Sequence, residues 1–280
     1  MECTRLHEVV ERMGYIGLSI PAERAQLLRN SLLILQKENH FRKIYYWGRI
    51  NGVGNDYHIA FGYAKDSLKD RKFFYSLDGL DWLLLPKPTK CGKFLTPLAT
   101  TLFDGNPSIV TNVYSKNPAF PPDEDAEEFY QGPVPQFLKE EDRLSATVEF
   151  ITEECQIIPR GALYKHPDGS ITENMVFQGL DPIESLDQKS YVHARFPREK
   201  WTANLVVRDD YNYSLDFLDP ISTDVPKECW NVQRYLASRL VILQNLYWPG
   251  MTFYHIPESP HYGSLYLGNG IKNLNIPFMV

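Results

Sequence analysis

The fold is decided by one stretch of the chain, which reads Ile44-Tyr-Tyr-Trp-Gly-Arg-Ile50, Asn51-Gly-Val-Gly-Asn-Asp56 and Tyr57-His-Ile-Ala-Phe-Gly-Tyr63. Its first and last segments are rich in β-branched and aromatic residues, which are typical of strands. The segment between them is rich in Gly, Asn and Asp, which are typical of turns. Two strand patterns joined by such a loop predict a β-hairpin.

More strand patterns lie towards both ends of the chain. Residues 72–77 and 80–85 predict two strands that extend the hairpin into an antiparallel meander, and residues 251–256 and 262–268 predict two more near the other end. The stretch 230–247 fits either a helix with an apolar stripe or a buried strand, because periodicity alone does not separate the two.

Helix patterns are fewer. Residues 21–39 predict an amphipathic helix, because small and apolar residues recur there at spacings of three and four. Residues 181–192 predict a short helix capped by Asp181, and residues 144–151 alternate like a strand. Together the patterns predict an α+β fold, mostly antiparallel β-sheet with a few covering helices.

The segment 117–142 breaks this pattern. It contains five prolines, and five of the six residues in 123–128 are acidic. Such a composition does not bury enough apolar surface to fold alone. We interpret it as an acidic, Pro-rich exposed loop within a single domain that spans residues 1–280. A segment that becomes ordered on a partner is the alternative.

Composition argues against several classes of protein. The 280 residues carry a net charge of −6, whereas a nucleic-acid-binding surface needs dense Lys and Arg. No signal-peptide pattern begins the sequence, and no apolar run approaches the ~20 residues of a membrane span. The four scattered cysteines are expected to be free thiols. We therefore expect a cytoplasmic protein with neither a nucleic-acid nor a membrane partner.

The sequence contains no phosphate-binding glycine loop and no nucleophile elbow. His255 and His261, with Glu258 between them, are the best candidate metal ligands, but intervening prolines favour a turn that separates them. We predict no catalytic residues, no cofactor and no metal. The alternatives are an enzyme with a pocket around His255 or His193, and a small-ligand binding module. Acidic runs such as 140–142 are interpreted as solvated surface charges.

Aromatic residues are dense in the predicted strands, and aromatic side chains dominate both protein cores and interface hot spots. Either role is open for each residue. The candidate interface residues are Tyr46, Trp47, Phe74, Trp82, Trp248, Phe253, Tyr254, Tyr262 and Tyr266.

Several of these segments carry a family resemblance. Tyr46-Trp-Gly-Arg-Ile50, Ile157-Ile-Pro-Arg-Gly-Ala-Leu-Tyr-Lys165, Trp248-Pro-Gly250 and Thr252-Phe-Tyr-His255 occur in the order found in the radial spoke head protein 9 family. The chain resembles this family over residues 20–280, apart from the acidic loop.

The resemblance implies a non-catalytic structural subunit of the radial spoke head in the axoneme of motile cilia and flagella. It implies partners among the other spoke head proteins, namely the paralogous head proteins four and six and the spoke scaffold proteins. It also implies transient contact with the central-pair apparatus and a part in relaying its signals to the dynein arms.

Overall fold

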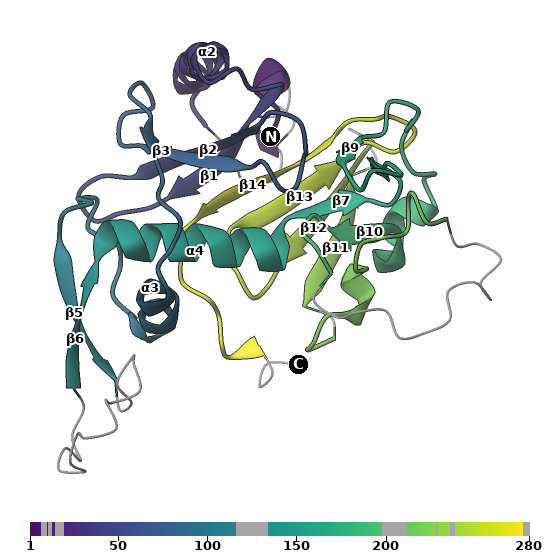
Figure 1. Ribbon diagram of the computed structural model, residues 1–280. Coiled ribbons are helices and arrows are strands. Elements are labelled where there is room, and N and C mark those ends of the chain that lie inside the picture. The colour runs from purple at the N-terminus through teal and green to yellow at the C-terminus, as the bar shows by residue number, and fades with distance from the viewer. Residues whose placement is uncertain are drawn as a thin grey trace.

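The largest element of the molecule is an eight-stranded sheet with the strand order β11-β12-β13-β14-β1-β2-β3-β4 (Figure 1). The computed structural model describes residues 1–6, 10, 13, 14, 20–115, 134–197, 212–227, 229–235 and 239–276. The strands of the sheet are β1 (Lys43–Ile50), β2 (Tyr57–Tyr63), β3 (Lys72–Ser76), β4 (Leu83–Leu84), β11 (Trp230–Tyr235), β12 (Leu240–Asn245), β13 (Met251–His255) and β14 (Tyr262–Gly268).

Strands from the two ends of the chain meet in the middle of this sheet, where β1 and β14 pair in parallel. Every other neighbouring pair is antiparallel, including the predicted hairpin of β1 and β2. The mostly antiparallel sheet confirms the predicted α+β class. The ambiguous stretch 230–247 contributes two strands, β11 and β12, to this sheet.

Gly48 makes the parallel junction possible. A bulge interrupts β1 between Tyr46 and Gly48, and Gly48 has a φ of 147°. A Cβ atom added there would lie 2.1 Å from the backbone oxygen of Tyr266, so any side chain would push β14 away. Glycine is therefore required for this close approach of two backbones.

Helices cover both faces of the sheet (Figure 1). Helix α2 (Ala22–Glu38) confirms the predicted amphipathic helix and buries Leu28 and Leu32 in one core with Tyr46. Helix α4 (Glu140–Cys155) crosses the opposite face and buries Leu144 in a second core with Trp47. Because both faces are covered, all seven residues of β2 are buried.

Smaller elements surround this framework. They are η1 (Cys3–Arg5), α3 (Lys90–Leu95), η3 (Thr96–Leu98), β5 (Val110–Ser115), β6 (Val134–Lys139), β7 (Ile157–Pro159), β8 (Leu163–Lys165), β9 (Ile171–Glu173), η4 (Glu184–Leu186), η5 (Gln188–Ser190), β10 (Tyr191–His193) and η7 (Ile221–Thr223). Within the described part of the chain, every helix is too short or too polar to cross a membrane.

Two of the predicted elements are wrong. Residues 144–151 belong to α4, not to a strand. Leu144, Val148, Ile151 and Cys155 are its core residues, and their spacing of three and four is helical. Residues 181–192 form two short 3-10 turns followed by β10, because the last residues pair with β7 instead of continuing a helix.

Only part of the predicted acidic loop, residues 117–142, lies among the residues that the structure describes. Residues 116–133, which include the acidic run 123–128, lie outside the described residues. The end of the segment, residues 134–142, forms β6 and the first turn of α4 and is therefore not a loop. The residues of β6 pair with β5 in a two-stranded ribbon.

Candidate functional site

Most of the candidate interface aromatics lie in the core. Seven of the nine are at most 5% exposed, because the strands that carry them are covered on both faces. These seven are Tyr46, Trp47, Phe74, Trp248, Phe253, Tyr254 and Tyr266. Their rings pack within this chain and do not reach its surface, so the core alternative holds for them.

The other two aromatics, Trp82 and Tyr262, are half-buried. The indole Nε1 of Trp82 donates a hydrogen bond to Ser31 Oγ at 3.1 Å. The ring of Tyr262 packs 6.3 Å from that of Phe253 and 6.2 Å from that of Phe177, and it borders a small, partly open pocket of about 60 Å³. Only these two of the nine present part of their surface to solvent.

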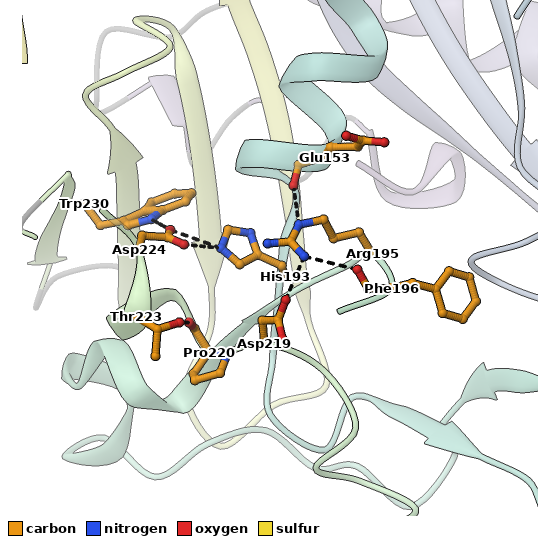
Figure 2. Close-up of polar contacts among 9 residues, drawn as sticks. All are labelled: Glu153, His193, Arg195, Phe196, Asp219, Pro220, Thr223, Asp224 and Trp230. Atoms are coloured by element: carbon orange, nitrogen blue, oxygen red, sulfur yellow. Dashed lines mark hydrogen bonds and ion pairs between the residues drawn. The ribbon is translucent and has the colours of Figure 1, made fainter. Parts of the chain in front are cut away.

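One polar cluster joins β10, the residue that follows η7, and β11 (Figure 2). His193 Nε2 lies 2.8 Å and 3.0 Å from the two carboxylate oxygens of Asp224. The indole Nε1 of Trp230 donates to the same carboxylate at 2.9 Å. The cluster thus ties the last residue of β10 to the first residue of β11 through one acidic side chain.

A second ion pair extends the cluster towards α4 (Figure 2). Arg195 Nη1 lies 2.7 Å from Asp219 Oδ2, and Arg195 Nε donates to the backbone oxygen of Glu153 at 2.8 Å. The backbone nitrogen of His193 also donates to the backbone oxygen of Asp219 at 2.9 Å. Residues 193–195 are therefore held between the end of α4 and the 219–224 segment.

A histidine beside an aspartate is the base of many catalytic triads, where its free nitrogen faces a nucleophile or a substrate. His193 is 1% exposed, and its Nδ1 atom is buried without a hydrogen-bond partner among the described residues. A general base has to reach the proton that it removes. Since this nitrogen is closed to solvent, the cluster is suited to joining segments of the chain.

The two histidines considered for a metal have different surroundings. His255 is fully buried, with its ring 6.5 Å from that of Phe177 and 6.2 Å from that of Tyr191, and burial lowers its pKa to about 4. His261 instead contacts the guanidinium of Arg5, a cation that would oppose a bound metal. No group of three or more potential ligands gathers anywhere among the described residues.

Sequence reasoning missed the most densely bonded carboxylate. Glu140 was interpreted as a solvated surface charge, which is wrong, because it is 3% exposed. Its carboxylate accepts hydrogen bonds from Tyr57 Oη at 2.6 Å and from the backbone nitrogens of residues 104, 105 and 106 at 2.9, 2.8 and 3.2 Å. The turn composition of Asp104-Gly105-Asn106 was the available signal, since successive backbone N–H groups in a turn bind anions.

The fold and its polar clusters define a β-sheet protein whose buried charges connect strands and helices. No family model matches the chain. A curated Bos taurus protein named Radial spoke head protein 9 homolog is 40% identical over 267 residues, 94% of each chain. Homologues of the same name from Homo sapiens and Danio rerio are 39% identical over 94% of each chain and 35% identical over 100% of each chain. The chain belongs to the radial spoke head protein 9 family, which confirms the resemblance.

Proposed function

We propose that this protein is a structural subunit of the radial spoke head in the axoneme of cilia and flagella. The observation that carries the proposal is the 40% identity over 94% of the chain to a protein named for the radial spoke head. A match of that length includes both halves of the large sheet and the elements that cover it, so the proposal concerns the whole chain.

In this proposal the protein takes part in no catalytic step. It acts mechanically, as a rigid sheet platform required for spoke head assembly. Its neighbours are the paralogous head proteins four and six and the spoke scaffold proteins, and the assembled head relays transient contacts with the central-pair apparatus to the dynein arms. Burial of both sheet faces supports this role, because a close-packed interior transmits strain.

Size-exclusion chromatography of salt-extracted axonemes tests the proposal. We expect this chain to elute in a large complex together with the other spoke head proteins. Deletion of the gene should remove spoke heads from axonemes viewed by electron tomography and should impair ciliary beating. Elution as a free monomer, or intact spoke heads without the chain, would refute the proposed function.

A further inference from the structure

A groove of about 1020 Å³ lies between helix α2 and the segment that contains β4. We call it the α2 groove. Its apolar side chains are Leu27, Ile34 and Leu35 from α2 and Leu80, Trp82 and Leu83 from the opposite wall. The helix residues that border it recur at spacings of three and four along the whole of α2, so they form one straight stripe.

This stripe differs from the one that packs on the sheet, and the two share only Leu35, which is also part of the core. Leu28 and Leu32 face the core and are fully buried, whereas Ile34 is 58% exposed. On the opposite wall Leu80 and Leu83 are 54% and 57% exposed. Large apolar side chains gathered on both sides of a groove are typical of an interaction site.

Hydrogen bonds hold the two walls in place. Ser31, on α2, accepts a hydrogen bond from Trp82 Nε1 at 3.1 Å and donates one to the backbone oxygen of Gly79 at 2.7 Å. The groove therefore exists before anything binds, and a partner would not have to order its walls. Such preorganisation lowers the free-energy cost of binding.

The described residues that border the groove carry charge of one sign. Of the twelve described residues that border it, the charged ones are Glu23, Glu38 and Asp81, and none of the twelve is basic. Glu23 and Glu38 lie at opposite ends of α2, and Asp81 lies on the other wall. An occupant that places cations near these three carboxylates would be complementary to the groove.

We propose that the α2 groove binds an amphipathic helix of a neighbouring subunit, with its apolar stripe in the groove and Lys or Arg residues on its flanks. A helix fits because the 17 residues of α2 present a stripe of helical spacing that is about 25 Å long. Addition of a strand at the sheet edge does not fit, because β4 has only two residues and offers few backbone hydrogen bonds.

Two other occupants are disfavoured by charge. A second copy of this chain would bring the same acidic residues together in a two-fold symmetric contact. The acidic run 123–128 of this chain has the same sign as the groove. The inference rests on the proposed function only for the source of the helix, which is a neighbouring spoke subunit.

Photo-cross-linking in assembled axonemes tests the inference. The full chain would carry p-benzoylphenylalanine in place of Ile34, and the cross-linked peptide would be sequenced by mass spectrometry. We expect one segment of another polypeptide, with apolar residues at spacings of three and four and more Lys and Arg than Asp and Glu. The same probe at Val53, which is 72% exposed on another loop, should not capture that segment.

Variants of the groove give a quantitative test. A synthetic peptide of the captured segment should bind at least tenfold more weakly to Ile34→Glu and to Glu38→Lys than to the parent chain. Val53→Glu, which adds an exposed charge elsewhere, should bind like the parent. Thermal melts would verify that each variant is folded.

Each failure has a distinct meaning. Capture of a second copy, of an acidic segment or of nothing, while the chain remains in the spoke head complex, would overturn the groove assignment alone. Equal affinity of the parent and Ile34→Glu would overturn it too. Absence of the chain from the axoneme would overturn the proposed function and with it the source of the helix.

Discussion

Replacement of Glu140 by glutamine should destabilise the protein strongly, although the two side chains have nearly the same shape. The carboxylate of Glu140 is buried at the start of α4. One of its oxygens accepts from Tyr57 and from two backbone nitrogens, and the other accepts from the backbone nitrogen of Asp104. Glutamine can place its carbonyl oxygen on only one of the two sides.

The expected loss follows from these four hydrogen bonds. On the side of the amide nitrogen, the partly buried N–H group of Asp104 loses its acceptor and faces the donor NH2 group, which costs about 1–3 kcal/mol. The other three bonds remain but lose the charge that roughly doubles their strength, at about 0.5–1 kcal/mol each. Allowing for local relaxation, Glu140→Gln should lower the free energy of unfolding by about 3–5 kcal/mol.

Denaturant unfolding followed by tryptophan fluorescence would measure this loss. Glu141→Gln is the matched control, because Glu141 is the next residue and its partners are the Tyr75 hydroxyl at 3.1 Å and the half-exposed Lys139. It should cost no more than about 1 kcal/mol. A loss below 1 kcal/mol for Glu140→Gln, or equal losses for both variants, would refute the assignment of Glu140 as a buried connector.

Three further predictions concern the backbone, pH and thiols. Gly48→Ala should lower the free energy of unfolding, measured with denaturant, by about 3 kcal/mol or more, because the new Cβ would lie 2.1 Å from a backbone oxygen of β14. An unchanged free energy of unfolding would contradict the close parallel pairing of β1 and β14. Burial lowers the pKa of His255 to about 4, below its usual value of about 6.5, so the unfolded chain takes up the proton first. The contribution of neutral His255 to the free energy of unfolding is therefore fully present above pH 6.5 and falls by about 3 kcal/mol as the pH drops to 4. In thermal melts across this pH range, the His255→Phe variant should lose less stability than the parent chain. An equal loss in both proteins would contradict the prediction. Of the four thiols, Cys91 should be alkylated first, because the other three are buried. Burial also raises the pKa of Cys3 to about 11 and that of Cys229 to about 12, which lowers their reactivity. Mass spectrometry after limited iodoacetamide treatment measures the order, and earlier alkylation of any other cysteine would contradict the prediction.

Much of the fold could be predicted where the pattern is local. The hairpin of β1 and β2 follows from strand-forming residues on both sides of a Gly- and Asn-rich loop, and α2 follows from apolar residues at helical spacing. The prediction for 144–151 was wrong because most residues of α4 near its start are buried, so polar and apolar positions do not separate clearly there.

The candidate site likewise contains features that local sequence patterns predict and features that only the folded chain creates. Aromatic density indicated residues of large contact area, but the sequence did not say on which side of each strand a covering helix would lie. The α2 groove depends on residues about 50 positions apart in the chain, such as Ser31 and Trp82, which meet only in the folded protein.

The sequence by itself determined the family, the α+β class and the positions of the hairpin and of α2, because these follow from residue order and local periodicity. Tertiary structure alone decided that both sheet faces are covered, which makes seven candidate interface aromatics core residues. It also decided that β1 and β14 join the two ends of the chain and that Glu140 is buried. The physical reason is that burial depends on contacts between distant segments, and the period of a single segment does not specify which other segment will cover it.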